Sequence, residues 1–311
     1  MSKLFEVRKT SSKGTGVFAI QDIRAGTVIL REKPILTCLN LDWHVWFSAC
    51  LQLMEGIDAL APEKKAEVMN LYAYSPEQHI ALISGMVEAA MKMRKNRYPK
   101  EEYIKLSFVM KTNFFNLDVN GGQDLCGLYL DFSRINHSCA CNANNDVQPA
   151  ADGSQEMVIR AKEMIAKGSE ITIEYLSPWT ANRAARMNEI WGFNCLCPVC
   201  DKSSTNIDQA KRDTYEKMFQ QIRDNDEKMF DDKASTLNQK IKRHQLRLAA
   251  LKHLGPSVAL LNEYSVGVPL YNIAGNKDKV IEALRASYEA MLLCVPPDDP
   301  VRVQLKDMLG R

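Results

Sequence analysis

The sequence contains no apolar run long enough to cross a bilayer, and its first residues include no apolar segment typical of a signal peptide. Its net charge is small, with 40 Lys and Arg against 38 Asp and Glu, which argues against a surface built to bind nucleic acid directly. These absences favour a protein of the cytoplasm, the nucleus or both, with no membrane partner. We expect the chain to be a monomer.

The composition is that of an ordinary globular protein. The chain has 311 residues, of which 46% are hydrophobic and 25% charged, so it can bury a large core and form about two domains. Its nine cysteines are an odd number. In a reducing compartment they are better explained as thiols or metal ligands than as disulfides.

The patterning predicts an α+β fold. Short strands are expected in residues 4–37, where glycines separate runs rich in β-branched and aromatic residues. Helical spacing follows from residue 41 to 106, and strand-like and loop-like sequence returns from residue 107 to 175. The best strands are expected at 17–20, 27–30, 157–160 and 171–175, and helix starts or breaks at Pro62, Pro76 and Pro99.

The remainder of the chain is predicted to be helical. One short helix is expected at residues 181–190, before a cluster of cysteines, and further helices from about residue 205. Residues 275–284 resemble the second helix of a tetratricopeptide unit, but a plain helical bundle explains them equally well.

Cys195, Cys197 and Cys200 are spaced so that one loop can bring three thiols to one ion. Three buried structural cysteines are the simpler alternative, but three thiols in six residues favour a metal site. A tetrahedral zinc site needs a fourth ligand, for which Cys139 is our choice and Cys141 the competitor. Four thiolates leave no open position for water, so the zinc would be structural and its binding part of the folding energy.

Three other features carry polar groups that a ligand pocket could use. Asn136 and His137 lie three and two residues before the predicted ligand Cys139, although a lone histidine is usually structural. Tyr175 ends an alternating strand, where packing is the usual role, but at a pocket its hydroxyl could orient an amine. The turn at residues 13–16 lacks the ending of a phosphate-binding loop, and its glycines would let the backbone approach a ligand closely.

Taken together, these segments resemble the SET-domain protein lysine methyltransferases, most closely the branch whose SET domain is split by a MYND finger. The resemblance covers roughly residues 4–37 and 107–201 and implies small curved β-sheets with a pseudo-knotted passage at Asn136. The matching segments are residues 13–19, Gly127-Leu128-Tyr129, Asn136-His137-Ser138-Cys139, residues 168–175, and Trp191-Gly192-Phe193-Asn194 with the cysteine cluster.

The resemblance also implies an activity and a site. The activity is methylation of a lysine side chain on a histone or non-histone protein substrate, with S-adenosylmethionine as cofactor, and the catalytic residue is Tyr175. The residues expected to contact the methionine end of the cofactor are Lys13, Gly14 and Thr15. Further cofactor contacts are expected from Asn136, His137 and Asn113, with Phe193 and Leu196 near the adenine.

The sequence departs from that branch in three places. Residues 38–60 offer only Cys38, His44 and Cys50, too few for a MYND finger, so we expect helices to fill the insertion. Residues 140–142 lack the proline that usually precedes the asparagine. Trp191 stands where a tyrosine is common near the lysine channel, so the number of methyl groups transferred is not implied.

We therefore predict five parts: the N-terminal part of the SET domain (1–37), a helical insertion (38–106), the C-terminal part of the SET domain (107–180), a zinc-binding post-SET region (181–204) and a C-terminal helical domain (205–311). The last is expected to form a wall over the substrate cleft.

Two other functions compete with this prediction. The first is a catalytically inactive SET-fold scaffold that binds a partner through its helical C-terminal half, against which intact Asn136, His137 and Tyr175 argue. The second is a zinc-dependent interaction module without a cofactor, which leaves the turn at residues 13–16 and the tyrosine strand unexplained.

Overall fold

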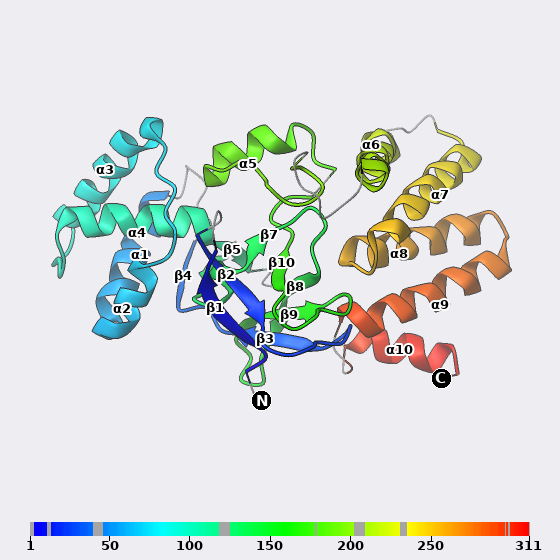
Figure 1. The fold of residues 1–311 in the computed structure, drawn as a ribbon, viewed down its shortest axis with the longest axis horizontal. Coiled ribbons are helices and arrows are strands. Elements are labelled where there is room, and N and C mark those ends of the chain that lie inside the picture. Colours follow the sequence, from blue (N-terminus) through cyan, green and yellow to red (C-terminus); the bar gives the residue numbers. More distant parts are fainter. Residues whose placement is uncertain are drawn as a thin grey trace.

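The structure, a computed structural model, describes residues 3–10, 14–39, 46–117, 125–177, 179–201, 209–230, 235–295, 297 and 299–310. The strands lie in the middle of the molecule, helices α1–α4 lie on one side of them, and α6–α10 lie on the other (Figure 1). Helix α5 (Arg183–Trp191) lies between the two helical groups (Figure 1). The confirmed fold is thus α+β, with helices and strands largely segregated.

The first sheet brings together segments from the two ends of the SET-like region. Its strands follow the order β1 (Phe5–Lys9), β2 (Thr15–Ala19), β10 (Glu170–Ile173) and β7 (Asn136–His137). Strand β2 is antiparallel to β1 and β10, whereas β7 is parallel to β10. In that parallel pair Asn136 lies opposite Thr172, so the Asn136–His137 dipeptide lies beside the strand that leads to Tyr175.

Two further antiparallel sheets complete the middle of the molecule. One has the order β3 (Val28–Glu32), β9 (Gln155–Ala161), β8 (Ala143–Pro149), and the other β4 (Leu36–Leu39), β6 (Leu125–Leu128), β5 (Phe115–Leu117). The strands expected at 17–20, 27–30, 157–160 and 171–175 are confirmed in β2, β3, β9 and β10, although β10 ends two residues before Tyr175. The largest side chains of the shared core are Tyr129 and Phe132, both almost fully buried.

Four helices fill the region where a MYND finger would stand: α1 (Trp46–Ala59), α2 (Pro62–Met69), α3 (Glu77–Lys92) and α4 (Lys100–Asn113). The prolines lie where the sequence predicted helix starts, with Pro62 in the first turn of α2 and Pro76 and Pro99 at the N-caps of α3 and α4. Proline is tolerated there because the first helical N–H groups have no intrahelical acceptor. The four helices share a core with β4 and β6.

The predicted end of the helical insertion is wrong at helix α4. Strand-like and loop-like sequence was expected from residue 107, but the helix continues to Asn113. The run Phe108-Val109-Met110 is buried together with Tyr103, Leu106 and Thr112, so this helix is enclosed on nearly all sides. A short apolar run does not show by periodicity whether it is a buried strand or a buried helix, and here packing against α1, α2 and α3 decided the outcome.

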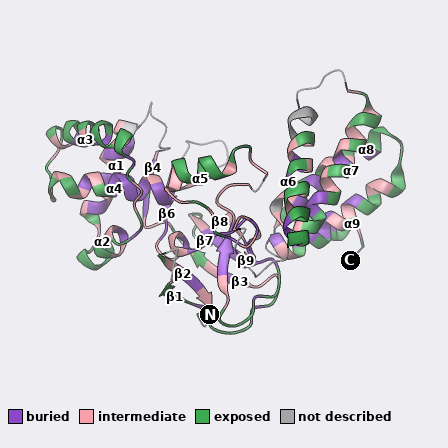
Figure 2. Cartoon of the chain, turned by 45° about the horizontal axis from the view of Figure 1, so that its top comes forward, coloured by how far each residue is buried: buried purple, intermediate pink, exposed green. Residues whose placement is uncertain are grey.

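The C-terminal half consists of α6 (Gln209–Phe230), α7 (Leu237–Leu254), α8 (Val258–Ile273), α9 (Lys277–Cys294) and α10 (Pro300–Met308). Successive helices pack against one another, and their buried faces are turned toward each other while exposed faces point outward (Figure 2). Whether they form tetratricopeptide units stays a prediction. No helix among the described residues has the length and apolar character needed to cross a membrane.

Candidate active site

A cavity of about 920 Å³ opens between the first sheet, the helices α2–α4 and the segment after α5. This volume is within the range of roughly 300–1,000 Å³ that small-molecule sites occupy. The cavity is lined by every residue that the sequence predicted for the tyrosine and cofactor site except Lys13, which lies outside the described residues: Gly14, Thr15, Asn113, Asn136, His137, Tyr175, Phe193 and Leu196.

Tyr175 lies just after β10 with its phenol held by two neighbours. Its Oη donates a hydrogen bond to the carbonyl oxygen of Ile135 at 2.6 Å, and its ring lies 5.3 Å from that of Trp191. Burial raises the pKa of Tyr175, so the phenol stays protonated at neutral pH. Because its only proton is committed to Ile135, the oxygen can offer a ligand only its lone pairs.

His137 links the tyrosine to the cysteine cluster. Its Nδ1 accepts a hydrogen bond from the backbone N–H of Tyr175 at 3.0 Å, which assigns the ring proton to Nε2. Nε2 lies 3.4 Å from Sγ of Cys139 and donates toward it. Both ring nitrogens are therefore engaged within the protein, so a cofactor contact from His137 would come from its main chain or its ring face.

The side chain of Asn136 joins β7 to the start of β2 and to β10 through hydrogen bonds. Its Nδ2 donates to Oε1 of Glu170 at 2.7 Å and to the carbonyl oxygen of Thr15 at 3.1 Å. A Cβ atom at Gly16 would lie 2.8 Å from Oε1 of Glu170 and 3.0 Å from Nδ2 of Asn136, so only glycine permits this approach. The arrangement leaves Oδ1 of Asn136 as an acceptor for a ligand.

Glu32 is a positioning residue that the sequence analysis missed. From the end of β3 its carboxylate accepts hydrogen bonds from three successive backbone N–H groups, those of Leu130, Asp131 and Phe132, at 2.6, 3.0 and 2.9 Å. Burial raises the pKa of Glu32 and these hydrogen bonds oppose that rise. The carboxylate thereby fixes the entry to the short 3-10 helix η1 (Phe132–Arg134), which leads directly to Ile135 and Asn136.

The opposite wall comes from the helical group, and of its residues only Asn113 was expected from the sequence, because the others belong to no motif. Nε1 of Trp191 donates to the carbonyl oxygen of Thr112 at 3.0 Å, and Nδ2 of Asn113 donates to that of Tyr72 at 2.6 Å. A Cβ atom at Gly192 would overlap the ring of Tyr74, so the end of α5 packs directly on the α2–α3 connection. This wall consists of Asn70, Leu71, Tyr72, Thr112, Asn113 and Phe114.

The C-terminal helices contribute no described residue to the lining of this cavity, and whether they form a wall over the substrate cleft stays a prediction. All described residues that line this cavity lie between Gly14 and Leu196, and none belongs to α6–α10. Those helices instead pack behind the cysteine cluster, where Phe219 of α6 is fully buried against Cys139, Cys197 and Val199.

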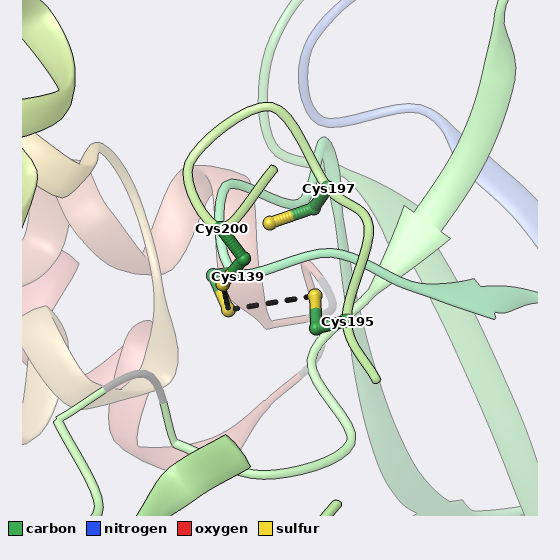
Figure 3. Close-up of side chains that lie close together, drawn as sticks. All are labelled: Cys139, Cys195, Cys197 and Cys200. Atoms are coloured by element: carbon green, nitrogen blue, oxygen red, sulfur yellow. Dashed lines mark hydrogen bonds between the residues drawn. The ribbon is translucent and has the colours of Figure 1, made fainter. Parts of the chain in front are cut away.

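The four cysteines predicted as zinc ligands lie together (Figure 3). The sulfur atoms of Cys139, Cys195, Cys197 and Cys200 all lie within 4.8 Å of one another, with Cys139 at 4.0 Å from Cys195 and 3.5 Å from Cys200. Tetrahedral zinc with Zn–S bonds of about 2.3 Å requires sulfur separations of about 3.8 Å. The donor set and its spacing therefore fit zinc.

The competitor Cys141 lies apart from this cluster. Its sulfur is 3.9 Å from Nζ of Lys162, on the side of the C-terminal helices. The charge of a four-thiolate site would be partly balanced by Arg183, whose Nη2 lies 3.6 Å from Sγ of Cys200 and 3.1 Å from Oε1 of Glu216. Such surrounding groups are a common part of structural metal sites.

Residues 14–176 match the protein family described as the SET domain. The chain belongs to the SET domain family. The match includes every strand of the three sheets except β1. It also includes the helices α1–α4 and the residues Asn136, His137 and Tyr175. The resemblance predicted from sequence is confirmed at this level. The residues after 176, which include Phe193, Leu196 and three of the four cysteines, lie outside the match.

Curated relatives of this SET domain protein carry names of histone-lysine methyltransferases. Histone-lysine N-methyltransferase SET5 of Candida albicans is 33% identical over 110 residues, which is 33% of this chain and 21% of that protein. The protein of the same name from Saccharomyces cerevisiae is 29% identical over 117 residues, or 36% of this chain and 21% of that protein. Histone-lysine N-methyltransferase set5 of Schizosaccharomyces pombe is 21% identical over 208 residues, or 66% of this chain and 53% of that protein.

The similarity thus covers 21% of the length of the first two relatives. A solved structure of a Plasmodium falciparum protein aligns with 58% of this chain and 100% of that chain at 17% identity, but its TM-score of 0.27 carries no argument.

Proposed function

We propose that this chain is an S-adenosylmethionine-dependent protein-lysine N-methyltransferase that acts on a histone or non-histone protein in the cytoplasm or the nucleus. The observation that carries the proposal is one cavity in which Tyr175, Asn136 and the Gly14–Thr15 turn converge within a SET domain. The names of the relatives support the same activity.

The residues of the cavity fit the cofactor. Gly14 has a positive φ of 72°, and a Cβ atom there would meet no protein atom within 4 Å, so the turn faces open space where the methionine end can lie. Oδ1 of Asn136 can accept a hydrogen bond, and the half-buried Phe193 and 51%-exposed Leu196 offer apolar surface to a purine ring. When bound, S-adenosylmethionine supplies a methyl carbon activated by its sulfonium.

The chain's own contribution is to present a neutral amine in line with that carbon. The described lining residues include several aromatic rings and no Asp or Glu, so the cavity disfavours an ammonium ion and lowers the pKa of an entering lysine. The oxygen of Tyr175, with its proton held by Ile135, accepts a hydrogen bond from the amine and orients it. Since its pKa is raised, Tyr175 is not a general base in this proposal.

The zinc we assign to Cys139, Cys195, Cys197 and Cys200 has a structural role. Four thiolates leave no position for a substrate or water. The ion would join the segment after α5, which carries Phe193 and Leu196, to the turn that carries Asn136 and His137.

The test incubates the purified chain with methyl-labelled S-adenosylmethionine and either core histones or a protein extract, and locates the label by mass spectrometry. Label on lysine side chains, lost in Tyr175→Phe, is the expected result. A chain that binds the cofactor by calorimetry but labels no lysine in any fraction would favour the scaffold. A chain that retains zinc and binds no cofactor would favour the interaction module.

A further inference from the structure

A second pocket, of about 250 Å³, lies between the sheet that contains β8 and β9 and the helices α6, α7 and α8 (Figure 1). Among the described residues, it shares no lining residue with the candidate active site. Glu174 lines this pocket, whereas the next residue, Tyr175, lines the larger cavity. Because successive residues of an extended chain point to opposite sides, the segment after β10 separates the two cavities.

The pocket contains one buried cation. Lys162, which follows β9, is 9% exposed, and its Nζ donates to the carbonyl oxygen of Leu254 at 3.1 Å and lies 3.9 Å from Sγ of Cys141. Leu254 and Cys141 both line the pocket, so Nζ lies at its wall. An ammonium has three N–H groups, and no carboxylate of a described residue pairs with this one. A buried charge without a counter-charge favours an anionic group on a ligand.

The opposite charge in the pocket belongs to Glu174. Burial raises the pKa of Glu174, and a hydrogen bond from Ser177 and the nearby charge of Lys162 oppose that rise. Glu174 nevertheless forms no ion pair with Lys162 or with any other described residue. A cationic group on a ligand would therefore stabilise this carboxylate where water is partly excluded.

The other lining residues are either apolar or able to form hydrogen bonds. Apolar surface comes from Ala143, Trp179, Tyr215, Leu251, Leu254 and Ala259, and amide or hydroxyl groups come from Asn144, Asn145 and Ser257. Ser257 is the N-cap of α8, and its Oγ accepts a hydrogen bond from the backbone N–H of Leu260 at 3.1 Å. Since Ser257 and Ala259 both line the pocket, the positive end of this helix faces it.

We propose that this pocket binds a small free α-amino acid with an apolar side chain. Such a molecule offers a carboxylate to Lys162 and the start of α8, an ammonium to Glu174, and a side chain to the apolar wall. At about 30 Å³ for each water-sized group, the pocket holds about eight non-hydrogen atoms, which is the size of valine. An anion alone would leave Glu174 unpaired, and a cation alone would leave Lys162 unpaired. The site lies outside the proposed methyltransferase cavity and does not depend on that activity.

Calorimetry on the full chain tests the proposal with L-alanine, L-valine and L-leucine. S-adenosylhomocysteine is present throughout, so that an amino acid does not bind where the methionine end of a cofactor would lie. We expect at least one of the three to bind saturably with a Kd of about 1 mM or below. For L-valine, the analogues 3-methylbutanoate, which lacks the amine, and 2-methylpropylamine, which lacks the carboxylate, should bind roughly 10-fold more weakly or worse. No saturable binding of any of the three amino acids overturns the proposal.

Two variants then assign the binding to this pocket. Lys162→Met keeps the buried apolar stem and removes the ammonium, and Glu174→Gln keeps the shape and removes the negative charge. Each should weaken amino-acid binding by roughly 10-fold or more. Lys167→Met and Glu101→Gln are the matched controls, because both change exposed side chains that do not line the pocket.

Circular dichroism establishes that each variant is folded. Glu174 is only half-buried and its replacement is nearly isosteric, so Glu174→Gln decides the outcome if Lys162→Met does not fold. An amino acid that binds the parent and Glu174→Gln with affinities within twofold of each other binds elsewhere, and the assignment to this pocket is then wrong.

Discussion

The hydroxyl of Tyr175 donates to the carbonyl oxygen of Ile135 and leaves only lone pairs for the amine. Tyr175→Phe removes this acceptor and little volume, so we expect the fold to survive and the single-turnover rate of methylation to fall by about 100-fold or more, as for loss of one preorganised polar contact. Cofactor affinity should change much less, and calorimetry would measure it. Tyr264→Phe, in α8, is the control. A Tyr175→Phe protein that reacts at the parental rate would remove the hydroxyl from the mechanism.

Asn136 lines the same cavity, and we propose that it serves cofactor binding there. Its amide donates to the carbonyl oxygen of Thr15 and to the carboxylate of Glu170, so Asn136→Ala removes the side-chain bonds that hold the start of β2 beside β7 and β10. We expect cofactor affinity to fall by roughly 10-fold, with a smaller loss of rate once the cofactor is saturating. The opposite balance, with a lower saturated rate and unchanged affinity, would contradict this division between Asn136 and Tyr175.

Sequence and resemblance predicted the residues that belong to short motifs, such as Asn136, His137 and Tyr175. They did not predict Glu32, because a single carboxylate at the end of a strand is common and carries no spacing signal. Its position becomes meaningful only when β3 is placed beside η1 in three dimensions.

Among the elements, the meeting of the cysteine segment after α5 with Cys139 was predicted from the spacing of the thiols, while the zinc itself stays a prediction. Helix α4 was predicted only in part, since its buried apolar run lacks a polar face that would reveal the helical period. The wall that it forms with the α2–α3 connection depends on contacts between separate elements, such as that of Trp191 with Thr112. Local sequence patterns do not contain such contacts.

The cysteine segment yields a prediction about metal content. The parent chain should carry about one zinc, Cys197→Ser should lose it, and Cys141→Ser should keep it, because only Cys197 belongs to the cluster. Elemental analysis of purified proteins measures all three. The reverse pattern for the two variants would show that Cys141 is a ligand.

Thiol reactivity gives an independent measure of the same site. After removal of zinc by a chelator, the partly exposed Cys195 and Cys200 should be alkylated much faster than the buried Cys38 and Cys294. Burial raises the pKa of Cys38 to about 12 and that of Cys294 to about 11, so both are mainly protonated, unreactive thiols near pH 8. Equal modification of Cys195 before and after chelation would mean that no metal protects it.

At the scale of the whole molecule, the SET domain and the C-terminal helices share buried surface at the cysteine cluster. Phe219 of α6 is fully buried against Cys139, Cys197 and Val199, and the guanidinium of Arg183 lies 5.1 Å from its ring centroid. Nζ of Lys162 also donates to the carbonyl oxygen of Leu254 at the end of α7, at 3.1 Å. Because these contacts join the two halves directly, we expect them to unfold as one cooperative unit.

Phe219→Ala tests this coupling. The change should lower the free energy of unfolding by about 3–5 kcal/mol, as for other buried phenylalanines. The denaturation curves followed by tryptophan fluorescence, circular dichroism and zinc release should shift together, since one transition governs them all. Met308→Ala, at a side chain 66% exposed on α10, should change stability by less than about 0.5 kcal/mol. Two separate transitions, with zinc release following only one of them, would show that the helical half is an independent domain and that Phe219 does not couple it to the SET domain.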